Sequence, residues 1–97
     1  MGDKLVEIVN VEPLEGRRVR LTFDDGIVKI VDVGKLVDGS MFEADFNLPE
    51  VFNAVQIYPY GHGIYWPNEF DLCPEMLRYY AEGEILHEGQ IENPVLN

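Results

Sequence analysis

Residues 17–33, RRVRLTFDDGIVKIVDV, restrict the fold of this chain more than any other segment. The first run alternates apolar and polar residues, so that Val19, Leu21 and Phe23 share one face of a strand. An Asp-Gly pair follows, and between two β-rich runs such a pair is a strong hairpin signal. The segment therefore predicts an antiparallel hairpin with one face in a hydrophobic core.

The return strand of this hairpin, residues 27–33, alternates less cleanly, because Lys29 and Asp32 fall on opposite faces. This pattern indicates either a bulge or a strand that is covered on both faces. Other segments rich in β-branched and aromatic residues predict further strands. The expected strands are residues 4–13, 17–23, 27–33, 54–59 and 64–66.

Two short helices are expected, in addition to a helical turn at residues 34–37. The first helix would follow Asn47 as its N-cap, and Glu50 stands at the capping-box spacing. The second would begin at Pro74, since proline suits a first helical turn, and would end at Gly83 as a C-cap. Its apolar stripe at helical spacing consists of Met76, Leu77 and Tyr80.

Neighbouring strands with helices gathered late predict an α+β fold, with an antiparallel sheet of about five strands and one helix at the C-terminal side. A chain of 97 residues is long enough for one domain with a modest core. We expect that domain to span residues 1–83, with a tail over residues 84–97. The tail is expected either to hang free or to add an edge strand to its own sheet or a neighbour's.

Charge limits the classes of partner. Seven basic and eighteen acidic residues give a net charge of −11, which repels phosphate backbones and anionic lipid, so direct nucleic-acid binding is disfavoured. No apolar run approaches the roughly 20 residues that cross a bilayer, and the first residues lack the apolar stretch of a signal peptide. The lone Cys73 cannot form an internal disulfide, which favours a reducing, cytoplasmic setting.

The stretch IYWPNEFDLCPEML, residues 64–77, holds the single tryptophan and the single cysteine. Cys73 precedes a helix start, which stabilises a thiolate, but nearby carboxylates oppose a second anion. A small, partly buried residue at the helix start accounts for Cys73 without chemistry. His62, Asp71, Cys73 and His87 lack the paired spacings of zinc sites, so we expect no metal or cofactor.

Four aromatic residues cluster around the last predicted hairpin: Tyr58, Tyr60, Tyr65 and Trp66. Strand alternation puts Tyr58 and Tyr60 on one face, and puts Tyr65 and Trp66 on opposite faces. Exposed aromatic side chains mark binding surfaces, so these four residues are the candidate partner-binding site. A tryptophan in the core with tyrosines at its rim is the structural alternative.

Positive charge is concentrated on one strand, at Arg17, Arg18 and Arg20. In so acidic a chain we expect these arginines to pair with carboxylates of the same molecule. Contact with an anion or a partner is the alternative.

Three segments resemble the small bacterial domain-of-unknown-function 2442 family: VNVEPLEGRRVRLTFDDGIVKIVDVGKLV, MFEADFNLPEVFNAVQI and IYWPNEFDLCPEML. Together they cover about residues 8–80 of the chain, in an order and spacing that are specific only in combination. The resemblance implies an α+β fold with a curved antiparallel sheet, and no settled activity. Some members carry a helix-turn-helix domain after this one, and others are encoded beside small partner proteins in pairs that resemble toxin–antitoxin systems. The tail here is too short for a helix-turn-helix, so DNA binding is not carried over.

One departure from the family pattern bears on backbone geometry. Where the family usually has a Gly-Ala pair, this chain has Glu69 and Phe70. If the family glycine adopts a positive φ at this position, then either Glu69 adopts the same strained backbone conformation or this chain forms a different turn.

These observations favour a non-enzymatic protein-binding or regulatory module that engages its own copy or a basic partner. The alternative is a small-ligand-binding protein or a thiol enzyme that uses Cys73 with Asp71 and His62. A third hypothesis is an acidic mimic of DNA, which requires carboxylates at phosphate-like intervals on one face.

Overall fold

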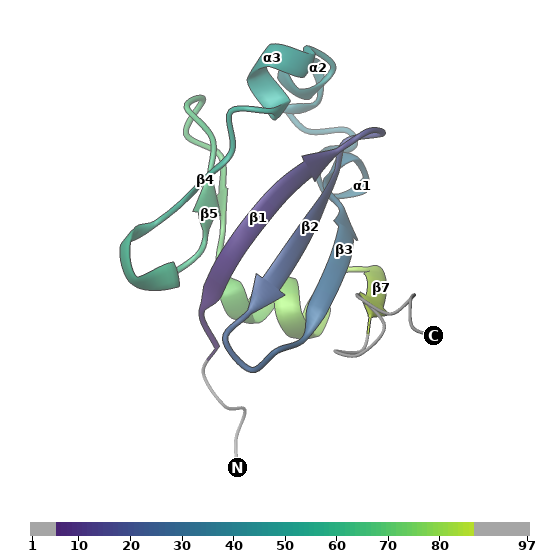
Figure 1. Cartoon of the computed structure of the whole chain (residues 1–97). Helices are drawn as coiled ribbons and strands as arrows, with labels where there is room; N and C mark the ends of the chain where they lie inside the picture. Colours follow the sequence, from purple (N-terminus) through teal and green to yellow (C-terminus); the bar gives the residue numbers. More distant parts are fainter. Residues whose placement is uncertain (1–5, 87–97) are drawn as a thin grey trace.

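The computed structural model describes residues 6–86, and within them the chain forms two antiparallel sheets (Figure 1). The larger sheet has the order β1-β2-β3-β7 and contains β1 (Ile8–Leu14), β2 (Arg18–Phe23), β3 (Val28–Asp32) and β7 (Gly83–Leu86). The smaller sheet contains β4 (Gln56–Ile57), β5 (Ile64–Tyr65) and β6 (Asp71–Leu72). The short helical elements are α1 (Val33–Val37), α2 (Glu43–Phe46), α3 (Pro49–Phe52), the 3₁₀ turn η1 (Pro59–Gly61) and the π-helical η2 (Met76–Tyr80). The α+β class and the antiparallel pairing are confirmed, although the strands divide between two sheets instead of forming one.

The β2–β3 hairpin forms as its alternation predicts. Val19, Leu21 and Phe23 are buried in the core, and the register sets Val19 opposite Val31. The turn closes where the Gly26 N–H donates to the Phe23 carbonyl at 3.0 Å. The pairing of β1 with β2 is interrupted once, because its register shifts between residues 8 and 10.

Lys29 explains the imperfect alternation of β3. Its side chain faces the core and is 3% exposed, while its neighbour Val28 on the other face is buried as well. The Lys29 ammonium donates to the carbonyl oxygens of Leu77 at 2.8 Å and Ala81 at 2.7 Å, at the end of the last helix. A cation at a helix C-terminus satisfies carbonyls that have no partner within the helix. Cover on both faces, and not a bulge in β3, therefore accounts for the pattern.

The predicted capping box at Asn47 and Glu50 is wrong. The chain forms two one-turn helices here, and Asn47 is the C-cap of α2. The N-cap of α3 is Leu48, which makes no side-chain cap hydrogen bond. Because α2 precedes α3 directly, Asn47 lies one residue too early, and its side chain accepts a hydrogen bond from Arg17 instead. The predicted turn at residues 34–37 is confirmed as α1.

The last helix differs from its prediction at its end. The Ala81 N–H donates to the Met76 carbonyl at 2.8 Å, which is an i→i+5 bond that widens the turn. Leu77 is buried as expected, whereas Tyr80 is 73% exposed and does not belong to the apolar stripe. The C-cap is Ala81, and Gly83 begins β7 instead. A Cβ at Gly83 would overlap the Ile30 carbonyl oxygen, so the pairing of β7 with β3 requires glycine there.

Strand β7 adds residues 84–86 to the domain's own sheet, as one of the two alternatives for the tail predicts. The remainder of the predicted tail, with His87, lies outside the described residues.

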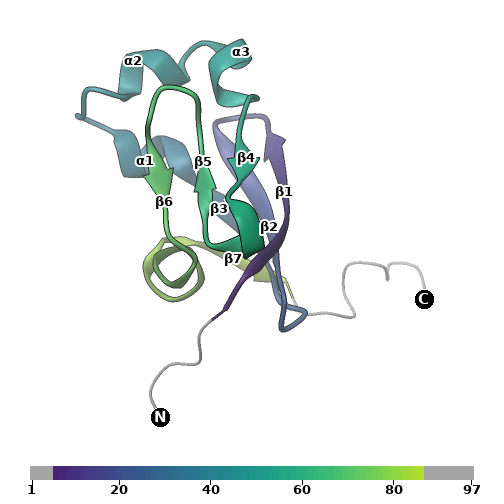
Figure 2. The same cartoon turned by 90° about the vertical axis from the view of Figure 1, so that its left-hand side faces the viewer.

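The smaller sheet packs against the larger one, and in the view turned by 90° it lies in front of it (Figure 2). Helices α2 and α3 lie at one end of β4, and η1 lies at its other end. An aromatic cluster joins helices α2 and α3 and the residue before them to the β5–β6 hairpin, and it is formed by Phe42, Phe46, Phe52, Trp66 and Phe70. This packing leaves the outer face of the smaller sheet and the η1 turn as surface.

Candidate functional site

The outer face of the smaller sheet carries two stacked tyrosines. The rings of Tyr58 and Tyr65 lie 4.5 Å apart with planes 28° apart, and both side chains are half-buried. The Tyr58 hydroxyl donates to Asp71 Oδ2 at 2.7 Å, which ties the start of the η1 turn to β6. This hydrogen bond to the carboxylate raises the pKa of Tyr58 above its usual value, with smaller contributions from burial and from the charge of Asp71. The pair is a fixed aromatic platform.

Tyr60 projects from the η1 turn between β4 and β5. Its side chain is 81% exposed, and its backbone has φ 65° and ψ 17°, in the left-handed region. This conformation costs a residue with a Cβ about 1–2 kcal/mol. The ring of His62 lies 6.0 Å from its own. A strained residue that holds a large aromatic ring in water is a candidate functional residue.

The backbone of this turn is fixed by close packing on β1. A Cβ at Gly61 would lie 2.7 Å from the Ile8 carbonyl oxygen, so only glycine fits there. Within the turn, the Gly61 N–H donates to the Tyr58 carbonyl at 3.0 Å, and the Tyr58 N–H donates to the Gly63 carbonyl at 2.9 Å. Tyr60 therefore extends from a supported turn.

Trp66 does not share this surface. It is 1% exposed, and its indole N–H donates to the Phe52 carbonyl at 2.8 Å. In this fold so buried a side chain cannot contact a partner, and Trp66 is a core residue, as the structural alternative held. We call the remaining three residues, Tyr58, Tyr60 and Tyr65, the tyrosine surface.

A neighbouring cavity of about 290 Å³ brings His62 and Cys73 together. Cys73 is exposed, which corrects the expectation that it is partly buried. Glu7 and Glu75 also line this cavity. Glu75 is one of the carboxylates expected near Cys73, whereas Glu7 lies too far away in the chain for the sequence to connect it with Cys73. Asp71 does not line this cavity, so of the three residues named in the thiol-enzyme alternative only Cys73 and His62 meet there. Residues 6–86 contain no group of three or more side chains suited to hold a metal ion.

Of the three arginines that were expected to pair with carboxylates, one forms an ion pair and two do not. Arg20 pairs with Glu12 at 3.2 Å, as expected for an acidic chain. Arg18 donates from Nε to the Glu15 carbonyl at 3.2 Å, and Arg17 donates to Asn47 Oδ1 at 3.1 Å. Neither Arg17 nor Arg18 has a carboxylate within 4.0 Å among residues 6–86.

Arg78 forms an ion pair that sequence reasoning missed. Its guanidinium lies 3.1 Å from Asp25 Oδ2, and the two residues are separated by 53 positions. No local pattern could have paired them, because only the packing of the last helix beside the β2–β3 hairpin brings them together.

The fold and the surface together define a small acidic α+β domain, built from two short antiparallel sheets, that presents tyrosines on one side. A family model described as a protein of unknown function, DUF2442, matches residues 8–83, and the chain belongs to this family. Comparison with curated proteins gives no significant match, and comparison with solved structures gives none. Among the described residues, no helix is both long and apolar enough to cross a bilayer.

Proposed function

We propose that the chain is a non-enzymatic protein-binding module whose contact surface is the tyrosine surface. The observation that carries the proposal is Tyr60, a large aromatic side chain held 81% exposed on a strained but well-supported turn. A few aromatic residues supply most of the binding energy in many interfaces. Rigid tyrosines also lose little conformational entropy on binding.

Charge beside Tyr60 indicates the kind of partner. The cavity lined by His62 is also lined by two acidic residues, Glu7 and Glu75. A basic side chain of the partner would meet these carboxylates and could lie over the Tyr60 ring, where cation–π contacts are favourable. Two copies of a chain with a net charge of −11 repel each other, so a basic partner is favoured over self-association. The single exposed thiol of Cys73 supports a reducing, cytoplasmic setting.

The experiment is affinity capture from the native cell with three versions of the full chain, read by mass spectrometry. Tyr60→Asn removes the ring but keeps a residue that tolerates the left-handed conformation, so the fold is expected to persist. Tyr80→Asn makes the same change at another exposed tyrosine, on η2. We expect one basic protein that the wild type and Tyr80→Asn capture and that Tyr60→Asn loses. Equal capture by all three versions would place the interaction elsewhere and refute the proposal.

The exposed thiol favours one second candidate, a small-ligand or thiol function in the cavity shared by Cys73 and His62. The two functions separate in a Cys73→Ser variant. A binding module retains partner capture after this substitution, whereas a function that depends on the thiol is lost. A thiol enzyme also requires Cys73 to react with an electrophile faster than an unstructured peptide thiol does.

A further inference from the structure

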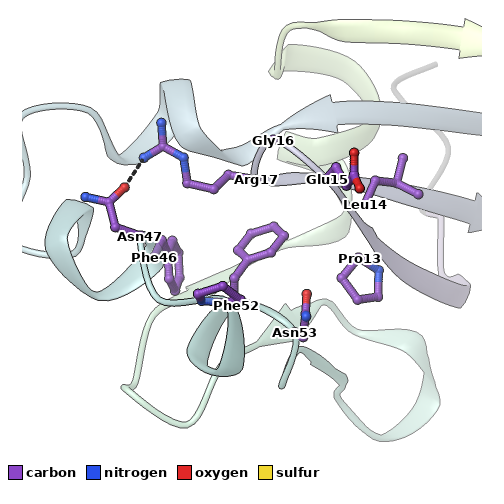
Figure 3. Close-up of a pocket in the computed structure, with 10 residues that line it drawn as sticks. Pro13, Leu14, Glu15, Gly16, Arg17, Phe46, Asn47, Phe52 and Asn53 are labelled. Atoms are coloured by element: carbon purple, nitrogen blue, oxygen red, sulfur yellow. Dashed lines mark hydrogen bonds between the residues drawn. The ribbon is translucent and has the colours of Figure 1, made fainter.

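A second cavity, of about 440 Å³, lies between the tip of the β1–β2 hairpin and helices α2 and α3 (Figure 3). Phe46 and Phe52 line it, with rings 5.5 Å apart, but they are only 1% and 3% exposed. Its accessible apolar surface therefore comes from Pro13, Leu14 and Pro49. Asn47 and Asn53 add polar groups at its edge. The volume falls within the roughly 300–1,000 Å³ typical of small-ligand sites. The cavity lies at the end of β4 opposite to η1 and Tyr60, so it is separate from the tyrosine surface.

Arg17 is held at the edge of this cavity by contacts of both its backbone and its side chain. Its backbone is left-handed, with φ 60°. Its guanidinium lies over Gly34, where a Cβ would come 3.1 Å from Arg17 Cζ, so a larger residue would displace it. A terminal nitrogen donates to Asn47 Oδ1 at 3.1 Å, and the Arg17 carbonyl accepts from the Gly34 N–H at 3.1 Å. Figure 3 shows the side chain extending toward Asn47 and away from Glu15.

This cation has no anionic partner among residues 6–86, although the chain as a whole carries eleven more negative than positive charges. An arginine has five N–H donors in a planar fork that matches a carboxylate, and one bond to an amide oxygen leaves donors for a ligand. Because the side chain is already held in place, binding would cost little further ordering.

We propose that this cavity binds a small monocarboxylate with an apolar body. The carboxylate accepts hydrogen bonds from Arg17, and the apolar body packs against Pro13, Leu14 and Pro49. A single negative charge fits better than a phosphate dianion, because Glu15 lines the same cavity and the net charge of the chain repels a second charge. The site uses other residues than the proposed protein-binding surface.

The test is a titration of the full chain followed by two-dimensional ¹H–¹⁵N NMR, with benzoate as the probe. Benzamide has nearly the same shape without the charge, and inorganic phosphate has the charge without the apolar body. We expect saturable shifts at residues 13–17 and 46–53, with a dissociation constant of about 1 mM for so small a ligand. Benzamide and phosphate should bind at least about tenfold more weakly, the equivalent of one charge-assisted contact.

Two variants connect the binding to Arg17. Arg17→Asn keeps a residue that tolerates the left-handed backbone and removes the guanidinium, and Arg18→Asn removes the neighbouring guanidinium outside the cavity. We expect benzoate affinity to fall at least about tenfold in the first variant and to stay within about twofold in the second. If the ¹H–¹⁵N chemical shifts of residues distant from the substituted position are unchanged, both variants are folded.

Four outcomes would overturn the proposal. They are no saturable shift below about 10 mM benzoate, shifts scattered over the surface, equal binding of benzamide or phosphate, and unchanged affinity in Arg17→Asn. Partner capture through Tyr60 is expected to persist in Arg17→Asn, so failure of this proposal and failure of the protein-binding proposal are distinguishable.

Discussion

The turn between β5 and β6 holds Glu69 in a conformation that suits glycine. The Glu69 N–H donates to the Trp66 carbonyl at 3.0 Å, and the Trp66 N–H donates to the Phe70 carbonyl at 2.9 Å. These two bonds define a three-residue hairpin loop, which usually ends in a left-handed residue and favours glycine there. Glu69 has φ 77°, so the strain anticipated from the missing family glycine is present. The substitution Glu69→Gly removes it.

Two opposing contributions set the expected change in the free energy of unfolding for Glu69→Gly. Release of the left-handed strain is worth about 1–2 kcal/mol. The greater freedom of glycine in the unfolded chain offsets about 0.5–1 kcal/mol of this. The Glu69 side chain is exposed and makes no hydrogen bond or ion pair with any residue between 6 and 86, so its removal breaks no contact there. We expect a net gain of about 0.5–1 kcal/mol, or about 2–8 °C in Tm for a domain of this size.

The assay is urea unfolding followed by the fluorescence of Trp66, the single tryptophan, which is buried three residues from the substitution. The midpoint should rise without a change in the m-value, because the surface exposed on unfolding stays the same. Glu69→Ala is the matched control, since it removes the same charge but keeps a Cβ at positive φ. An equal gain from alanine and glycine would attribute the effect to charge, and the reasoning from backbone strain would be refuted.

Three further predictions concern single side chains. Lys29→Met keeps the aliphatic chain but leaves the carbonyls at the end of the last helix without their donor, and urea unfolding should show a loss of about 1–3 kcal/mol; no loss would mean that the buried charge costs as much as its bonds contribute. Tyr58→Phe should remove the tyrosine that ionises late in an ultraviolet absorbance titration. Because the folded pKa of Tyr58 is raised, its bond to Asp71 stabilises the wild type below pH 10 and is lost as the pH rises through the folded pKa, so wild type and variant should converge in stability there. Cys73 should react with a thiol reagent in the folded protein without denaturant, and protection until unfolding would contradict its exposure.

The hairpin and the opposite placement of Tyr65 and Trp66 could be predicted because they depend on local alternation, whereas Tyr60 lies in the η1 turn and not on a strand face. The period of two in residues 18–23 specifies the core face of β2, and the Asp-Gly pair specifies the turn. The same period separates Tyr65, on the outer face of its sheet, from the buried Trp66. Family knowledge added the left-handed position of Glu69, which the sequence alone does not mark.

Other features depend on contacts between distant segments and leave no local pattern. Strand β6 consists of Asp71 and Leu72 alone, and aspartate is depleted in strands, so no β-rich run marks it. Lys29 resembles a misplaced surface residue until the last helix brings its carbonyls within reach. In the candidate site, the sequence identified the tyrosines, but which ring is exposed depends on the left-handed backbone of Tyr60. The Arg17 cavity joins a hairpin tip to helices some thirty residues away, as the contact with Asn47 at a separation of 30 shows.

The bonds from Lys29 to the last helix also bear on how the domain is made during synthesis. The acceptors lie 48 and 52 residues after the lysine, and β7, which completes the larger sheet, follows them directly. A nascent chain that has formed the β2–β3 hairpin carries an ammonium on the face meant for the core, with no carbonyls yet available to accept its hydrogen bonds. Burial of that face is therefore unfavourable until the last helix has left the ribosome. Folding of this domain is expected to be a late event, in which the hairpin made first becomes stable only with the helix made last.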